Sequence, residues 1–136
     1  MVVIKLMGSI SAREYIMHRL FISMGLDSEI GIYELYDRTM ASVRRCLSDL
    51  GYFIGPSTLE DRSEQLGRGF SQHLTLEPEG QLVATVIEMD QIVLFELHID
   101  ALEREVNRGL QSIVNDLIDT YDDIHASVRI ADDVRD

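Results

Sequence analysis

The chain contains a single cysteine and no long uninterrupted apolar segment. One cysteine, Cys46, excludes an internal disulfide and any zinc site built from several cysteines. No stretch reaches the roughly 18 consecutive apolar residues that a membrane-spanning helix needs. Residues 1–8 include a lysine and a short apolar run instead of the long apolar region of a signal peptide, so we expect a cytoplasmic protein. A length of 136 residues suits one domain, or one small domain with an oligomerisation segment.

The sequence also lacks the motifs that usually carry chemistry. It has no glycine-rich phosphate loop, no nucleophile elbow and no HExxH pair among its four histidines. We therefore expect no catalytic residues, no cofactor, no metal and no enzymatic activity. Cys46 could act as a redox-sensing thiol, but its place on an apolar stripe favours a core position, where free cysteine behaves as a small hydrophobe.

The net charge of −12 is distributed unevenly. Residues 1–74 contain eight basic and nine acidic side chains, whereas residues 75–136 contain four basic and fifteen acidic ones. Phosphate binding needs positive charge. Because the acidity lies almost wholly in the second half, the net charge does not exclude DNA binding by the first half.

The first half predicts three helices followed by two short strands. The helices are expected over residues 11–25, 27–36 and 39–50, with Ser11 and Thr39 as N-caps. The third helix carries an apolar stripe at helical spacing: Val43, Cys46, Leu47 and Leu50. A strand at 52–54, a polar loop at about 55–70 and a returning strand at 70–76 complete the order of a winged helix-turn-helix. The predicted fold class is mainly α with a small β-wing.

The exposed face of the helix at about 39–50 suits a recognition helix in the DNA major groove. Arginine can bind guanine bidentately, and serine can reach bases or phosphates. Arginines at the preceding turn and in the wing could each neutralise a phosphate. The candidate DNA-binding residues are Arg38, Thr39, Ser42, Arg44, Arg45, Arg62 and Arg68.

Three stretches, at 42–54, 59–62 and 74–80, resemble MarR-like winged-helix regulators. The resemblance covers about residues 11–82. It implies a sequence-specific transcriptional regulator in which Ser42, Arg44 and Arg45 contact bases or phosphates and Arg62 is the wing arginine, oriented by Asp61. The connection after the third helix is about two residues short of the family pattern, Leu76-Glu77 interrupts its closing motif, and little room remains for the usual N-terminal helix.

The second half predicts a long helix from Asp100 to Tyr121. Its apolar stripe comprises Leu102, Val106, Leu110, Ile113, Leu117 and Tyr121. Such a stripe beside a small domain is most simply a dimerisation helix, because paired recognition helices read half-sites about 34 Å apart. The alternative is that the stripe only covers its own domain.

Residues 81–98 fit either a helix or a β-hairpin. The family pattern favours a helix entered near Pro78, whereas the enrichment in β-branched residues favours strands. We favour the helix. The chain then divides into an N-terminal arm (1–10), a winged helix-turn-helix domain (11–78), a helical dimerisation segment (79–123) and a C-terminal tail (124–136).

The leading hypothesis is a homodimeric regulator of transcription that binds double-stranded DNA, does not enter a membrane, and has room for a small-molecule effector between wing domain and dimer helices. The second hypothesis is an acidic protein-interaction module, such as a secretion chaperone or an immunity-type protein. Under the second hypothesis, residues 81–98 should be strands.

Overall fold

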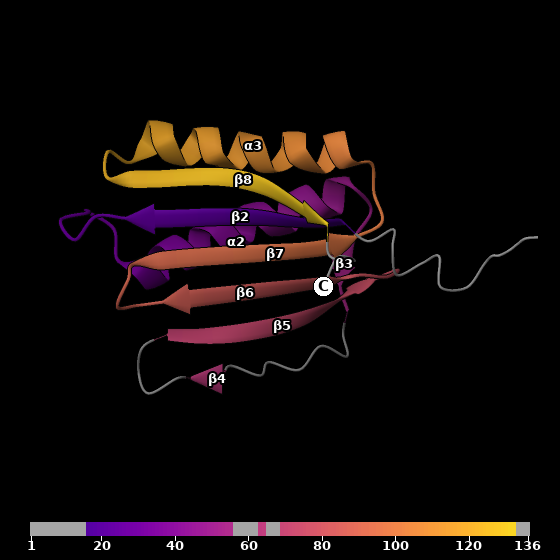
Figure 1. Cartoon of the computed structure of the whole chain (residues 1–136), viewed down its shortest axis with the longest axis horizontal. Helices are drawn as coiled ribbons and strands as arrows, with labels where there is room; N and C mark the ends of the chain where they lie inside the picture. Colours follow the sequence, from indigo (N-terminus) through magenta and orange to yellow (C-terminus); the bar gives the residue numbers. More distant parts are fainter. Residues whose placement is uncertain (1–15, 56–62, 65–68, 133–136) are drawn as a thin grey trace, which may run out of the picture.

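The computed structural model describes residues 16–55, 63–64 and 69–132. Its described part is an antiparallel β-sheet with two α-helices packed on one face (Figure 1). The predicted fold class, mainly α with a β-wing, is therefore wrong. The sheet also joins strands from both sides of the boundary expected at residues 78 and 79.

The elements follow one another along the chain with short connections. They are β2 (Ile16–Met24), α2 (Ile32–Asp49), β3 (Phe53–Ile54), β4 (Ser63–Glu64), β5 (Gly69–Glu77), β6 (Gln81–Ile87), β7 (Ile92–Ile99), α3 (Glu103–Thr120) and β8 (Ile124–Asp132). The strand order is β3-β5-β6-β7-β2-β8, and β4 also pairs with β5. The strand β2 thus lies between β7 and β8, although both of these strands are far from β2 in the sequence. This pairing joins the two ends of the described chain in one sheet.

The segment expected as the first helix is the strand β2. Its even-numbered residues from His18 to Met24 are buried, and Arg19, Phe21 and Ser23 alternate with them on the opposite face. Apolar residues occupy both sets of positions, so the segment matches a helical period and a strand period equally well. Pairing with two neighbouring strands, which the local sequence does not reveal, decides for the strand.

The second and third expected helices are one helix, α2. Its buried residues form a continuous stripe from Ile32 through Tyr36 and Val43 to Leu47. The turn expected at residues 37–38 does not form, because these positions lie on the exposed face of an unbroken helix. Arg38 there pairs with Glu34 one turn earlier, at 2.9 Å. Thr39, the expected cap, lies mid-helix and is only 1% exposed.

Residues 81–98 form the strands β6 and β7, so the predicted helix is wrong and the hairpin alternative is observed. The strand after the third helix is observed as β3, and the returning strand as β5. Most of the predicted wing, residues 56–62 and 65–68, lies outside the described residues. Pro78 lies in the turn between β5 and β6 instead of a helix.

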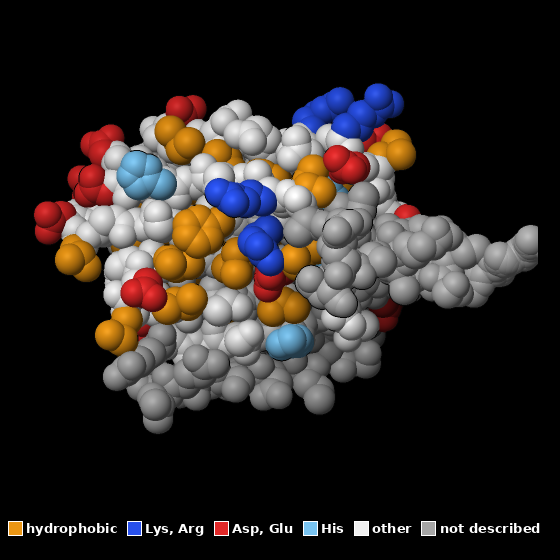
Figure 2. Space-filling model, viewed as in Figure 1, with side chains coloured by type: hydrophobic (Ala, Val, Ile, Leu, Met, Phe, Trp, Pro, Cys, Tyr) orange, Lys and Arg blue, Asp and Glu red, His pale blue; other side chains and the backbone are white. Residues whose placement is uncertain are grey.

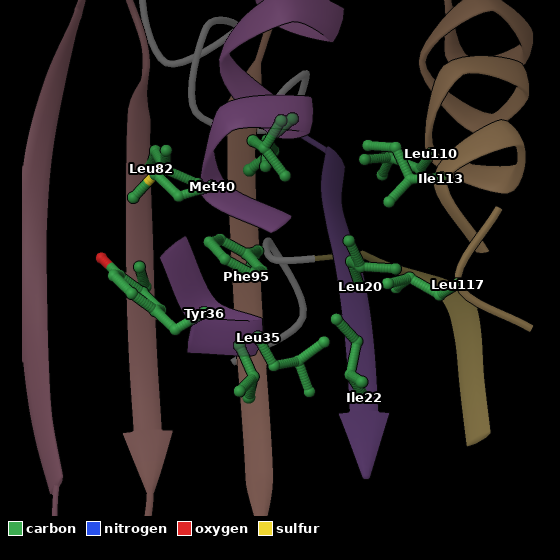
Figure 3. Close-up of a cluster of buried hydrophobic side chains, with 14 of the residues drawn as sticks. Leu20, Ile22, Leu35, Tyr36, Met40, Leu82, Phe95, Leu110, Ile113 and Leu117 are labelled. Carbon is green, nitrogen blue, oxygen red and sulfur yellow. The ribbon is translucent and has the colours of Figure 1, made fainter. Parts of the chain in front are cut away.

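The predicted helix from 100 to 121 is observed as α3. Its stripe, including Val106, Leu110 and Leu117, is buried against β8 and β2 of the same chain. The stripe therefore covers its own sheet, which is the alternative interpretation of the pattern. Figure 3 shows Leu110, Ile113 and Leu117 of α3 pointing toward Leu20 on β2.

The core lies between the sheet and the two helices. Tyr36 of α2 stacks on Phe95 of β7, with ring centroids 5.7 Å apart, and meets Phe70 of β5 edge-on at 5.0 Å. Its hydroxyl donates a buried hydrogen bond of 2.9 Å to Oε1 of Gln72. Aromatic contacts and this polar pair fix the position of α2 on the sheet.

Candidate functional site

The residues predicted to contact DNA do not form a recognition surface of the expected kind. Arg38 donates a 2.6 Å hydrogen bond to the Tyr121 hydroxyl and pairs with Glu34, which ties α2 to the end of α3. The Thr39 side chain is buried. Ser42, Arg44 and Arg45 lie on α2, which packs on the sheet with α3 beside it. Arg62 and Arg68 lie outside the described residues.

Ser42 and Arg45 border a shallow groove between α2 and α3, with a volume of about 390 Å³. Its charged lining is mixed and contains two arginines, Arg45 and Arg108, and three carboxylates, Asp49, Glu105 and Asp116. Such a groove lacks the net positive potential that phosphate binding requires. Because α2 is one unbroken helix packed on an antiparallel sheet, the interpretation of its second half as a MarR-like recognition helix is wrong.

Cys46 of α2 lines this groove and faces Gly109 of α3. A Cβ added to Gly109 of α3 would lie 2.5 Å from the Cys46 Sγ, so the glycine makes room for the thiol. Burial raises the pKa of the Cys46 thiol, and the Asp49 carboxylate raises it further. Since the thiolate is the reactive form, this environment suits packing better than redox chemistry.

A small acidic hollow lies at one end of the molecule, where the β2–α2 and α3–β8 connections meet. Asp27, Glu29, Asp122 and Asp123 contribute to its lining, and its volume is about 180 Å³. Across the described ranges, however, no group of three or more histidine, cysteine, aspartate or glutamate side chains is arranged to hold a metal ion. We assign no function to this hollow.

The most unusual surface is the sheet face opposite the helices, here called the open face, on which no described element packs. Residues from five adjacent strands line it in register. One row runs Ser71, Thr85, Leu94, Phe21 and Ser127 from β5 to β8. The next row runs His73, Val83, Glu96, Arg19 and Arg129. Neither row could be seen in the sequence, because each takes one residue from each strand.

The central strands of the open face carry apolar residues on both sides, next to polar ones such as Thr85 and Glu96 on the outer side. An antiparallel sheet with one face in water normally alternates apolar and polar residues. On β6 and β7, however, the outward positions include Val83, Ile87, Ile92 and Leu94, all partly exposed. Figure 2 shows hydrophobic side chains gathered over the middle of this face. Strands of this kind are typical of sheets that are covered on both faces.

Charged side chains lie beside this apolar band. Arg19 of β2 binds Glu96 of β7, with both Nε and Nη2 donating to Oε2 at 3.3 and 3.1 Å. Arg129 lies directly opposite Arg19 on β8 and forms no ion pair with a described residue. A hollow of about 390 Å³ opens between these strands, lined by Arg19, Phe21, His125, Ala126, Ser127 and Arg129.

The histidines do not converge on the open face. His73, His98 and His125 occupy three different rows, and His18 is buried on the helix side of β2.

Arg19, Glu96 and Arg129 were not among the residues predicted from the sequence. A usable signal was present only for Arg129: apolar and polar residues alternate along residues 124–130, which places Arg129 on the same face as His125 and Ser127 once this segment is recognised as a strand.

No known family matches the sequence, and no characterised protein matches it. Among solved structures, the chain is similar to the adenosylmethionine decarboxylase from Aquifex aeolicus VF5, with a TM-score of 0.48 and 12% identity. The match covers 86% of this chain and 90% of that one. A similarity this low assigns neither activity nor residue roles. Within the described residues, no helix is long and apolar enough to cross a membrane.

Proposed function

We propose that the chain is a homodimeric interaction module in which two copies pack through their open faces. The observation that carries the proposal is the apolar band formed by Phe21, Val83, Ile87, Ile92 and Leu94 on a sheet face that no described element covers. Exposed apolar patches of this kind mark interaction surfaces in soluble proteins. Residues 81–98 also form strands, as expected for an interaction module and not for the winged-helix regulator.

The size of the open face suits a stable interface. Five strands spaced about 4.8 Å apart, each about eight residues long at about 3.3 Å per residue, give a flat area of roughly 600 Å². Side chains that protrude from a sheet make the accessible surface larger than this flat area. Standard interfaces bury about 800 Å² of accessible surface per partner. Two open faces therefore provide enough surface for a specific dimer.

The pattern on the open face is complementary to itself. Leu94 lies next to Phe21, and Glu96 next to Arg19, on the neighbouring strands β7 and β2. A two-fold axis parallel to the strands and between β7 and β2 places Glu96 opposite the partner's Arg19, and Leu94 opposite the partner's Phe21. Packed sheets align within about 30°, so these pairs stay opposed close to the axis. Such an isologous contact closes a dimer.

The oligomeric state of the full chain tests the proposal. Sedimentation velocity over a dilution series should show a dimer that dissociates to a monomer. Glu96→Arg should weaken the dimer about 100-fold or more, because like charges then meet across the axis. The double variant Arg19→Glu/Glu96→Arg should restore it.

The matched control is Glu34→Arg, which disrupts the Arg38–Glu34 pair on α2 in the same way but lies away from the open face. It should leave the dimer unchanged. A wild-type chain that remains monomeric at every concentration would contradict the proposal, as would a double variant no better than Glu96→Arg alone.

A further inference from the structure

The hollow beside the apolar band is the second unusual feature of the open face. It opens between β2 and β8 and has a volume of about 390 Å³. Pockets for small organic ligands range from about 300 to 1,000 Å³. Its lining combines two arginines, a histidine and a serine with the ring of Phe21. We propose that this hollow binds a small organic anion: a carboxylate or phosphate group attached to a flat apolar group.

The arrangement of charge carries the first step. Arg19 and Arg129 are directly opposed partners on adjacent strands. Like charges in this position destabilise a sheet unless something neutralises them. Glu96 binds Arg19 from the β7 side, whereas no described carboxylate pairs with Arg129. One positive charge thus remains uncompensated beside the hollow.

The lack of a described carboxylate next to Arg129 is unusual for a chain of this composition. The sequence has 24 acidic side chains against 12 basic ones, yet none of the acidic side chains that the structure describes lines the hollow. The guanidinium of Arg129 can donate two parallel hydrogen bonds to a carboxylate or phosphate. The hydroxyl of Ser127 and the imidazole of His125 stand on the same side of β8 and can donate to the remaining oxygens.

The apolar part of the ligand follows from Phe21. This residue is paired with Ser127 across the two strands, one row away from the arginine pair. An anion held by Arg129 therefore places an attached ring within reach of the Phe21 ring, where aromatic groups pack favourably.

All lining residues belong to one chain, so the site does not require the proposed dimer. In that dimer, β8 faces the partner's β6, whose outward residues Val83, Thr85 and Ile87 are uncharged. The partner would cover the hollow without supplying a carboxylate, so Arg129 would still lack an anion.

Titration of the full chain with phenyl phosphate and benzoate, followed by amide chemical-shift changes, tests the site. Inorganic phosphate shows whether the ring contributes, and benzylammonium is the control of opposite charge. We expect saturable binding of at least one ring-bearing anion, with the largest shifts at residues 19–21 and 125–129. Arg129→Gln should weaken binding at least about tenfold, and Arg129→Lys should fall between it and the wild type, because lysine keeps the charge but loses the planar fork.

Arg108→Gln removes the same charge from α3 and should change the dissociation constant less than about twofold. Equal losses in Arg108→Gln and Arg129→Gln, binding of benzylammonium as strong as that of the anions, or no saturable binding of any anion would each overturn the inference. Sedimentation of the same samples separates the two proposals. Anion binding by a monomeric chain supports the anion site and contradicts the dimer. A dimer that binds no anion supports the dimer and contradicts the anion site.

Discussion

Leu94 is the residue whose replacement should affect the dimer most clearly. It lies near the centre of the open face, between Phe21 on β2 and Thr85 on β6, and its side chain is only partly buried in the single chain. Leu94→Glu places a carboxylate where the dimer would bury an apolar side chain. Because Leu94 already faces outward, the cost to folding of the single chain should stay near the variation of β-propensity, about 1 kcal/mol or less.

The cost to the dimer is much larger. Each copy loses the burial of a leucine side chain, worth about 1.5–3 kcal/mol. A two-fold dimer contains the change twice, so the loss is about 3–6 kcal/mol before any penalty for burying the carboxylates. This energy corresponds to a dissociation constant roughly 100- to 20,000-fold higher.

Sedimentation velocity over nanomolar to micromolar concentrations measures this change directly, and urea unfolding of the same samples checks that the variant is folded. Ile118→Glu is the matched control: it makes the same kind of substitution on α3, at a side chain that is 49% exposed. A wild-type dimer whose dissociation constant is shared by Leu94→Glu would refute the placement of the interface on the open face. Equal weakening by both variants would show a general effect of added negative charge.

Three further predictions concern the core and the thiol. Tyr36→Phe should lower the free energy of unfolding by about 1–3 kcal/mol by leaving Gln72 without its buried donor, and Tyr36→Phe/Gln72→Leu should recover part of this loss in urea unfolding. Gly109→Ala should destabilise the chain by about 1 kcal/mol, since overpacking against Cys46 outweighs the gain in helix propensity, but should stabilise it in a Cys46→Ala background. Modification of Cys46 by a disulfide reagent should be slow at neutral pH and accelerate only above the ordinary pKa range of cysteine, because burial and Asp49 raise its pKa; a rate equal to that of the urea-unfolded chain would contradict this.

The sequence predicted the helix α3 more accurately than the helix α2. The stripe of α3 has polar residues on its other side, and the helix appears within a few residues of its expected ends. The stripe of α2 was divided in two, because Asp37 and Arg38 resemble a turn. Both residues are compatible with a helix when they stand on its exposed face, and the Glu34–Arg38 pair supports that face.

The strands β2, β6 and β7 were the main source of error. All three carry apolar residues on both faces, so their sequence lacks the alternation that identifies a half-exposed strand. The apolar residues on both faces, which prevented these segments from being predicted as strands, also suggest that another surface covers the open face. The resemblance to MarR-like regulators then favoured helices, and the three short motifs that carried it lie in this structure on α2, β3, β5 and outside the described residues.

The sequence by itself determined the composition of the core, the apolar stripe of α3, the single cysteine and the absence of recognisable catalytic motifs. Only the tertiary structure decided which residues share a surface. Arg19, Glu96 and Arg129 come from strands separated by up to about a hundred residues of chain, and strand order alone makes them neighbours. The physical reason is that backbone hydrogen bonds between strands do not depend on side-chain identity, so the register that builds the open face is set by the packing of the whole sheet against α2 and α3.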